Sequence, residues 1–349
     1  MSVPQNQVAW LDKAGAAFRV GDTSIPTADA GEIIVKNAAV AINPLNCHMQ
    51  DLGIFVQQWP AVFGCDVAVE FYKAGPDVTR FNKGDRVIGH TVNLVSGHPQ
   101  DGGYALYTVV PADKVAILPN AVSFTDGVVV PFAIEAAVCA MSLKVPGQAM
   151  PGVSTPALGL PYPSLSTATS IGKTLVVYGG SSSAGSMVTQ VASSAGIHVI
   201  AIAGAHKFDL NKRSGAVQVF YYKDDKVMDN VVEAVKQSGN GVVGILDAIA
   251  TAEPWTVDLA ILEKLGGGHL ACSQPPPTGV PENVKAGMIF AVNDIATPVW
   301  NAYVTPALQA GKLFCLTTPT VVGKGLKFIQ EALNKSSTGG SGTKIVVEL

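Results

Sequence analysis

The chain has 349 residues, of which 48% are hydrophobic, and a formal net charge of −3 at pH 7. This length allows two domains of ordinary size, each with its own core. Because there is no basic excess, binding to nucleic acid or to an anionic membrane is not indicated. The five cysteines show no CxxC spacing, and residues 1–7 lack the features of a signal peptide. We therefore expect a reduced, cytoplasmic protein without a disulfide framework.

Strands and turns are predicted to dominate the first 130 residues. Five segments combine β-branched residues with flanking Gly, Pro and Asp clusters, as strands do: 7–10, 32–41, 67–74, 86–89 and 105–110. A helix is expected over 131–141. The Pro- and Gly-rich stretch 145–171 that follows is expected to lack regular structure and to act as a cover or a flexible insert.

The stretch 173–185 has the pattern of a strand, a turn and the start of a helix. Leu175 to Tyr178 is a short, uninterrupted apolar run, as in a strand buried on both faces of a parallel sheet. The turn supplies three small residues and three hydroxyl donors, namely Gly179, Gly180, Gly185, Ser181, Ser182 and Ser183. A helix N-terminus behind small residues favours a bound phosphate, and a second strand over 197–204 completes a βαβ unit.

The end of that second strand indicates which nicotinamide cofactor is preferred. The chain continues there as Gly204-Ala205-His206-Lys207, with no carboxylate before Asp209. A carboxylate at this place binds the 2′-hydroxyl of NAD, so a neutral-to-basic pocket favours NADP. The alternative is an ordinary surface turn with an incidental lysine.

Strands and helices alternate through the rest of the second half. Strands are predicted over 218–222, 242–249 and 267–273, with helices over 227–237 and 254–265. This alternation predicts an α/β fold with a doubly wound parallel sheet. At the end of one of these strands, Asp247 is interpreted as a helix cap rather than a catalytic carboxylate.

The tail beyond residue 299 has no obvious place in that sheet. A strand around 313–316, a helix over 325–333 and a closing strand over 344–349 are predicted. We expect this tail to return to the first domain. Residues 1–130 and 300–349 would then form the bent β-rich domain, and residues 131–299 the second domain.

These features, taken in order, resemble the medium-chain dehydrogenase/reductase superfamily, and more narrowly its zinc-free fungal toxD-like branch, which includes trans-acting enoyl reductases. The matching motifs are Ile42-Asn-Pro-Leu-Asn46, Gly84-Asp-Arg-Val87, Gly102-Gly-Tyr-Ala105, Val177-Tyr-Gly-Gly-Ser181, Phe208-Asp-Leu210 after His206, Val219 to Tyr222, and Ser341-Gly-Thr-Lys-Ile345. The resemblance implies a GroES-like catalytic domain, a Rossmann domain and NADPH bound between them. It leaves open a monomer or a homodimer.

The resemblance also implies roles for individual residues. Contacts with NADPH are expected from Leu45, Asn46, Cys47, His48, Gly180, Ser181, Ser182, Ser183, Ala184, Gly204, Ala205, His206, Lys207, Tyr222, His269, Leu270, Ser341 and Gly342. The substrate pocket is expected to include Ala136, Ala137, Ala140, Ile289, Phe290, Val292 and Asn293. The expected substrate is an unsaturated carbonyl compound, free or thioester-bound, with a polyketide synthase as a possible partner.

Zinc-dependent members of this superfamily bind their catalytic metal through three protein side chains. At the sequence position of the first zinc ligand this chain has Cys47-His48, and at that of the second it has Cys65-Asp66. At the position of the third ligand, residues 130–134 contain no side chain that could bind zinc. Because a catalytic zinc needs three protein ligands and an open position, we predict no metal and interpret both cysteines as core residues. A zinc site made from Cys47, Cys65 and Asp66 is the alternative.

Without a metal, such a site is best suited to transfer a hydride from the nicotinamide to the β-carbon of an activated alkene. Hydrogen-bond donors must then stabilise the enolate. His48, where this branch commonly has lysine, is the candidate catalytic donor, and its charge would depend on pH. Alternatively, His48 bonds a backbone carbonyl in a tight turn. Glu135-Ala136-Ala137 stands where relatives often have Thr-Ala, so a hydroxyl that contacts cofactor or substrate is missing.

The sequence is compatible with three other functions. The same scaffold supports zinc-dependent alcohol dehydrogenases and quinone reductases, because a fold does not fix a function. The missing threonine and the histidine in place of lysine are also compatible with a catalytically silent protein that binds NADPH.

Overall fold

The computed structural model describes residues 5–340 and 342–349, so the predicted cofactor residue Ser341 lies outside the described residues. The chain divides into two compact units. The β-rich domain comprises Met1–Phe132, Trp300–Gln309 and Thr318–Leu349, and the nucleotide domain comprises Ala133–Val299 and Ala310–Thr317. The β-rich domain is therefore discontinuous in sequence. Residues 310–317, expected in the β-rich domain, are part of the nucleotide domain.

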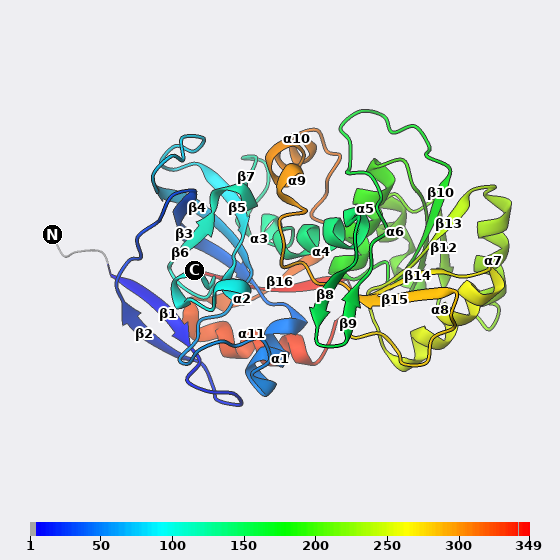
Figure 1. Ribbon diagram of the computed structural model, residues 1–349. Coiled ribbons are helices and arrows are strands. Elements are labelled where there is room, and N and C mark those ends of the chain that lie inside the picture. The colour runs from blue at the N-terminus through cyan, green and yellow to red at the C-terminus, as the bar shows by residue number, and fades with distance from the viewer. Residues whose placement is uncertain (1–4, 341) are drawn as a thin grey trace. The chain divides into compact units, whose positions relative to one another are not determined.

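A bent seven-stranded sheet forms the centre of the β-rich domain (Figure 1). Its strands, in the order β16-β17-β3-β4-β5-β7 with β6 paired to β3, are β3 (Glu32–Ala41), β4 (Asp66–Ala74), β5 (Arg86–His90), β6 (Tyr107–Pro111), β7 (Val115–Ile117), β16 (Thr318–Lys324) and β17 (Thr343–Glu348). The register between β3 and β4 shifts twice, between Ile34 and Val35 and between Asn37 and Ala39. Such irregularities bend and twist a strand, which lets β3 pair with three neighbours.

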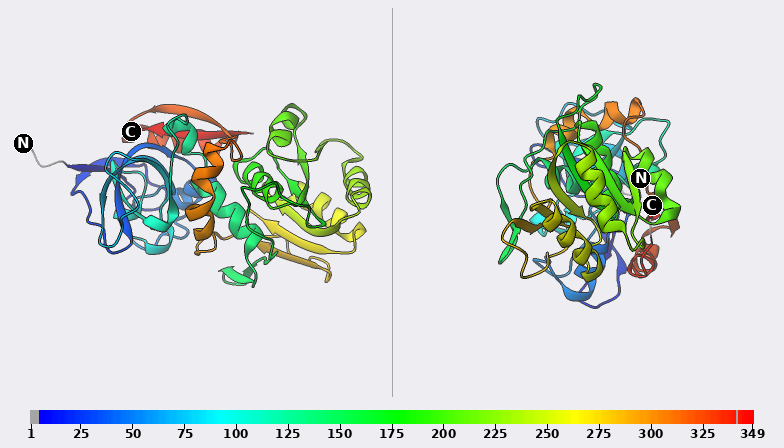
Figure 2. Two further views of the ribbon diagram at one scale, coloured as in Figure 1. Left: turned by 90° about the horizontal axis from the view of Figure 1, so that it is seen from above. Right: turned by 90° about the vertical axis from the view of Figure 1, so that its right-hand side faces the viewer.

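Short elements surround this sheet. A separate ribbon consists of β1 (Asn6–Trp10) and β2 (Arg19–Thr23), which pair antiparallel. The helices are α1 (Pro44–Leu52), α2 (Asn93–Ser96), α3 (Phe124–Gly127), α9 (Thr297–Ala302), α10 (Val304–Gln309) and α11 (Ile329–Ser337), with 3₁₀ turns η1 (Pro99–Asp101), η2 (Ala112–Lys114) and η4 (Leu326–Phe328). The views of Figure 2 place β16 and β17 beside the N-terminal strands, and the antiparallel pairing of β17 with β3 fixes this return.

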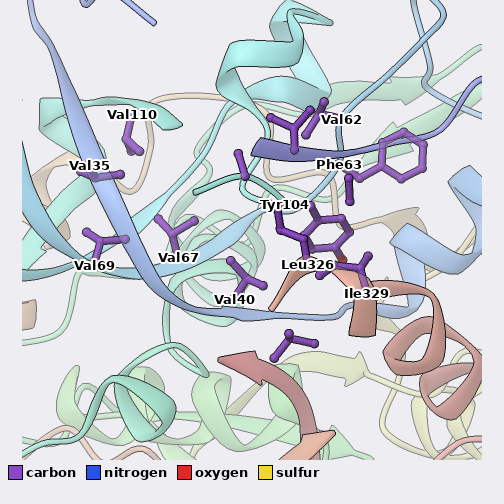
Figure 3. Packing of buried hydrophobic residues seen from close by; sticks show 14 of the residues in the cluster. Val35, Val40, Val62, Phe63, Val67, Val69, Tyr104, Val110, Leu326 and Ile329 are labelled. Atoms are coloured by element: carbon purple, nitrogen blue, oxygen red, sulfur yellow. The ribbon is translucent and has the colours of Figure 1, made fainter. Parts of the chain in front are cut away.

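The core of the β-rich domain joins residues from its beginning and its end (Figure 3). Val40 and Val67 are register partners on β3 and β4, and both are fully buried. In the close-up, Tyr104 lies next to Leu326 and Ile329 from the C-terminal segment. Burying this apolar surface holds the C-terminal segment on the first domain.

The nucleotide domain contains a six-stranded parallel sheet in the order β12-β11-β10-β13-β14-β15. Its strands are β10 (Lys173–Tyr178), β11 (His198–Ala203), β12 (Gln218–Tyr221), β13 (Gly241–Asp247), β14 (Gly268–Cys272) and β15 (Val284–Met288). This is the order of a dinucleotide-binding Rossmann sheet, whose strand order reverses beside β10.

Helices cover both faces of that sheet, because right-handed crossovers on the two sides of β10 place them on opposite faces. The helices are α4 (Pro131–Ser142), α5 (Ser183–Ser194), α6 (Phe208–Arg213), α7 (Val227–Gln237) and α8 (Ala252–Lys264), with the 3₁₀ turn η3 (Ala205–Lys207). Valines of α7 and apolar residues of α8 pack on Val176, Ile200, Ile245 and Leu270 in one buried cluster. The carboxyl ends of the strands consequently meet at one edge, where a ligand is expected.

Two predicted features of the nucleotide domain are wrong. The insert 145–171 is not structureless, because β8 (Gly147–Met150) and β9 (Val153–Thr155) form an antiparallel hairpin. Residues 313–316 are not a strand. Instead, Gln190 of α5 accepts a hydrogen bond from the Phe314 N–H over 2.7 Å and donates one to its carbonyl over 3.2 Å.

The segment Phe124–Ser142, which contains α3 and α4, is long and apolar enough to cross a membrane by length and composition alone. However, 72% of its most apolar window is buried inside the protein. It is therefore packed as a core helix of this fold.

Candidate active site

The glycine- and serine-rich turn lies at the carboxyl end of β10 and leads into α5. Gly179 adopts a left-handed conformation with φ of +74°, which suits glycine. Ser182 is the residue before α5, and its hydroxyl accepts a hydrogen bond from the Gly185 N–H over 2.9 Å. This cap satisfies one of the N–H groups at the helix start, and the remaining ones are suited to an anion.

The turn has no room for larger side chains. A Cβ atom at Gly180 would lie 2.1 Å from Asn211 Oδ1, and one at Gly185 would lie 2.3 Å from the Gly179 carbonyl oxygen. The hydroxyl of Ser183 is buried and, within the part of the chain that the structure describes, has no hydrogen-bond partner. A tight backbone cradle with an unused hydroxyl donor fits the pyrophosphate of a dinucleotide.

The residues predicted to bind the adenosine end are gathered after β11 and β12. Gly204 follows β11, and the nearest atoms to a Cβ placed there would be His206 Cε1 at 3.1 Å, with Tyr222 Cε1 at 3.9 Å. Lys223 was not predicted, yet its ammonium lies 5.6 Å from the ring centroid of Tyr222. Its position beside Tyr222 in the sequence is the signal that could have identified it. The rings of His206 and Tyr222 thus belong to the segments that follow β11 and β12. Lys207 and Lys223 belong to the same two segments.

Asp247 organises the turn after β13. Its Oδ1 accepts hydrogen bonds from the backbone N–H groups of Ile249, over 2.8 Å, and Ala250, over 2.9 Å. Ala250 has φ of +53°, an uncommon value for a residue with a side chain. Asp247 therefore stabilises this turn rather than capping a helix, since the residue before α8 is Thr251. The turn contacts the phosphate-binding turn, because a Cβ at Gly179 would lie 2.7 Å from the Ile249 side chain.

Two predicted cofactor residues do not join this edge. His269 and Leu270 lie inside β14, which ends at Cys272. The side chain of Leu270 is fully buried in the core cluster, so it has no surface to offer to a cofactor. The His269 imidazole is half-buried, and burial, reinforced by the nearby Lys285, lowers its pKa. The residues at the carboxyl edge of the sheet are therefore Cys272, which ends β14, and Ser273, which follows it.

In the β-rich domain, the motif residues Leu45 to His48 lie on α1, which the sequence did not predict. Pro44 is its first residue, where a fixed φ favours a helix start. Asn46 and Cys47 are buried, whereas the His48 side chain is exposed. Cys47 donates a hydrogen bond from its thiol to the Leu333 carbonyl over 3.6 Å, and burial raises the pKa of that thiol. Cys47 thus packs α1 against α11, and His48 is the accessible titratable group of the motif.

A buried polar cluster lies at the start of α1. Asp66 is completely buried, and its Oδ1 accepts the Phe132 N–H over 2.6 Å. Its Oδ2 accepts the Asn43 side-chain amide over 2.7 Å and forms an ion pair with Lys344 Nζ over 3.2 Å. Beside it, burial raises the pKa of the Cys65 thiol to about 12, so this thiol is neutral at physiological pH.

These residues do not form a metal site as they stand. Across residues 5–340 and 342–349, no three His, Cys, Asp or Glu side chains are grouped so that they could hold an ion. Asp66 uses both carboxylate oxygens for protein donors. A catalytic zinc needs three protein ligands, so the donor set does not fit the ion in this arrangement.

The two segments predicted to line the substrate pocket contact each other in the nucleotide domain. The thiol of Cys139 on α4 donates to the Phe290 carbonyl over 3.2 Å. The Asn293 amide donates to the same carbonyl and to Cys139 Sγ, each over 3.3 Å. Segment 289–293 is therefore fixed against α4.

The side chains of the two segments differ in accessibility. Ala137 and Ala140 are fully buried, whereas Ala136, Ile289 and Val292 are half-buried. The accessible part of this wall is therefore mostly apolar, with Asn293 as a half-buried polar residue. Glu135, which precedes the alanines, is fully buried as well.

The fold and these sites define a class of protein. Residues 29–120 match the family model described as the alcohol dehydrogenase GroES-like domain. The chain belongs to the medium-chain dehydrogenase/reductase superfamily, in its fungal enoyl reductase branch. Members of this superfamily are nicotinamide-dependent oxidoreductases, and this chain is an oxidoreductase of that type.

Two relatives and one solved structure are similar to this chain over nearly their whole length. The chain is 68% identical to dehydrogenase orsE of Emericella nidulans, over 99% of both chains. It is 34% identical to trans-enoyl reductase himH of Aspergillus japonicus, over 99% of this chain and 97% of the relative. Among solved structures, CurK enoyl reductase has the same fold, with a TM-score of 0.72, 16% identity and 99% coverage of both chains.

Proposed function

We propose that this protein is an NADPH-dependent reductase that transfers a hydride to the β-carbon of an activated alkene, either an enone or an enoyl thioester. The observation that carries the cofactor part is the cradle at Gly180 and Gly185, together with the lysines after β11 and β12. The trans-enoyl reductase name of one relative supports the alkene as the reducible group.

The residues of the nucleotide domain bind and orient the cofactor in this proposal. The N–H groups at the start of α5 and the Ser183 hydroxyl hold the pyrophosphate. Lys207, Lys223 and Tyr222 receive the 2′-phosphate, because lysine acts as a point charge for phosphate. Ser341, Gly342 and the α1 residues Leu45 to His48 complete the set. When bound, NADPH supplies the hydride.

The substrate is held by the apolar wall of α4 and segment 289–293. Half-buried Ala136, Ile289 and Val292 offer apolar surface to a hydrocarbon chain beside the alkene. His48, exposed on α1, donates a hydrogen bond to the carbonyl oxygen as negative charge develops there. Glu135 is buried, so it does not replace the missing threonine hydroxyl at the surface of α4. The remaining proton comes from water or a side chain.

We further propose that the reaction needs no metal and takes place in the cytoplasm. The engagement of Asp66 by Lys344, Asn43 and Phe132 supports a zinc-free site. The substrate is free or carried as a thioester by a polyketide synthase, and the enzyme acts as a monomer or a homodimer. A zinc-dependent alcohol dehydrogenase, a quinone reductase and a catalytically silent NADPH-binding protein are the competing functions.

The test is an absorbance assay with metal-analysed protein and a panel of α,β-unsaturated ketones and thioesters, quinones and alcohols. We expect oxidation of NADPH with the enones or thioesters, at least about tenfold slower turnover with NADH, and no effect of a chelator. Loss of activity with stoichiometric zinc removal would establish the zinc-dependent function instead. NADPH binding without turnover of any compound would establish the silent protein.

A further inference from the structure

The ion pair between Asp66 and Lys344 is unusual because both side chains are buried. Asp66 is 0% and Lys344 4% exposed, and their charged atoms are 3.2 Å apart. Charged side chains are rarely buried unless they are paired and hydrogen-bonded. Here the pairing is complete, because the Lys344 ammonium also donates to Asn43 Oδ1, and Asp66 accepts from Asn43 and Phe132.

The pair joins four segments that are far apart in the sequence. Asp66 begins β4, Phe132 lies in the first turn of α4, and Lys344 belongs to β17. Asn43 is the residue before α1. The carboxylate therefore fixes where α4 begins, and the ammonium ties β17 to the start of α1.

The connection to α1 continues into its first turn. The Asn43 side chain is engaged by both members of the ion pair, while its backbone N–H donates to Asn46 Oδ1 over 2.9 Å. The buried Tyr104 hydroxyl donates to the same oxygen over 3.0 Å. Asn46 and His48 are thus on a helix whose first turn is held by a network that ends at Lys344. Helices gain much of their stability from such anchoring, since a nine-residue helix alone is marginal.

We propose that Lys344 is a positioning residue that, through Asn43 and Asp66, holds the first turn of α1 and thereby the direction of His48. Its ammonium supplies the positive charge that the buried Asp66 requires. The effect of Lys344 on catalysis rests on the proposed function. Its effect on α1 does not.

Hydrogen exchange of the full-length protein tests the structural part. The variant Lys344→Met removes the ammonium and keeps an unbranched chain, and Lys335→Met on the exposed face of α11 is the matched control. We expect amides of α1 to exchange at least about tenfold faster in Lys344→Met, with α5 unchanged and no effect of Lys335→Met. Unchanged exchange in α1 would overturn the proposal.

A second variant covers the case in which Lys344→Met does not fold. Lys344→Met combined with Asp66→Asn leaves no unpaired buried charge, so it avoids the main penalty of the single substitution. Exchange in α1 should still be faster than in the wild type, because Asn43 has lost its ammonium partner. Wild-type exchange in this double variant would refute the role of Lys344.

Kinetics test the catalytic part. With an enone that the wild type reduces, Lys344→Met should lower kcat about tenfold, and it should have no further effect in a His48→Ala background. An equal loss in both backgrounds would show a general structural effect and overturn the positioning role. If the wild type reduces no alkene, the proposed function fails, while the exchange experiment still decides whether Lys344 anchors α1.

Discussion

At the scale of single residues, the phosphate-binding turn depends on two positions that exclude any side chain. Gly180 approaches the Asn211 side chain, and Gly185 approaches the backbone of Gly179. Glycine at such positions allows the close backbone approach on which pyrophosphate binding depends. The sequence predicted the turn from its composition, but it could not show which glycines are sterically required, because that depends on residues brought in by α6.

Replacing Gly180 with alanine should weaken cofactor binding. The new Cβ would lie 2.1 Å from Asn211 Oδ1, so the turn or the Asn211 side chain must move. We expect the Kd for NADPH, measured by fluorescence titration, to rise at least about tenfold. Gly147→Ala is the control, since its Cβ would meet nothing closer than 3.7 Å. Equal affinity of Gly180→Ala and the wild type would argue against this turn as the pyrophosphate site.

A second residue-scale feature is the carboxyl pair Asp247 and Asp258. Asp258 on α8 is fully buried, and among residues 5–340 and 342–349 neither of its carboxyl oxygens has a hydrogen-bond partner. Burial, followed by the neighbouring Asp247, raises the pKa of Asp258 well above its usual range. Burial also raises the pKa of Asp247, against the effect of the two N–H groups that it accepts. Both carboxyl groups therefore have pKa values above their usual range in the folded protein.

This pair predicts how stability depends on pH. The folded state binds a proton that the unfolded state releases above pH about 4, so the free energy of unfolding should decrease as pH rises through the range between the two pKa values of Asp258. Asp258→Asn removes the titrating carboxyl from this buried position, and should make this dependence flatter. Urea unfolding at several pH values measures it, with Asp12→Asn at the exposed Asp12–Arg19 pair as control. An unchanged slope in Asp258→Asn would contradict a raised pKa of Asp258 in the folded protein.

At the scale of elements, the parallel sheet could be predicted well and the irregular parts could not. The helix over Val227–Gln237 has the bounds that its apolar spacing predicted. The nine-residue α1 was missed because its apolar positions are few and its anchoring comes from Asp66 and Lys344. The strand expected at 313–316 was wrong because the backbone of Phe314 hydrogen-bonds to the Gln190 side chain of α5 instead of pairing with a strand.

The hairpin of β8 and β9 shows how the insert is held. It packs against β15, where a Cβ on Gly287 would lie 2.6 Å from the Ser154 carbonyl oxygen and 2.9 Å from Pro156 Cδ. Sequence composition suggested an unstructured cover, because proline and glycine dominate the insert. Its order comes from this long-range contact, which no local pattern encodes.

Gly287→Ala should therefore separate the hairpin from β15. Overpacking of this kind costs about 1–3 kcal/mol in the free energy of unfolding, measured by urea denaturation. Gly241→Ala in β13 is the control, since the nearest atom to its Cβ would be Lys173 Nζ at 3.5 Å. If both variants have the stability of the wild type, the hairpin does not pack closely on Gly287.

At the scale of the whole molecule, the chain ends where it began, in the β-rich domain. β17 pairs with β3, and Leu326 and Ile329 enter the core around Tyr104 (Figure 3). The sequence predicted this return because the tail had no place in the parallel sheet. The partners of Lys344 could not be predicted, because Asn43 and Asp66 are far from it in sequence and only the fold brings them together.

As with the fold, the sequence predicted some parts of the candidate site and missed others. Glycine and hydroxyl spacing predicted the turn at the start of α5, and the family resemblance supplied His48 and the segments around Ala136 and 289–293 as candidates. Lys223 was missed although it directly follows Tyr222, because the motif that was used ends at Tyr222. The predicted cofactor contact of Leu270 has no support from its place inside β14, because its side chain is fully buried, and that burial depends on the elements packed on the sheet.

The central claim is that the hydride of NADPH goes to the β-carbon of an alkene conjugated to a carbonyl. The most direct measurement uses NADPH deuterated at C4 with an α,β-unsaturated ketone or thioester, and locates the deuterium in the product by NMR and mass spectrometry. The account predicts a saturated carbonyl product with one deuterium, bound to the β-carbon. Deuterium on the carbonyl carbon of an alcohol product, or none in any product, would contradict it.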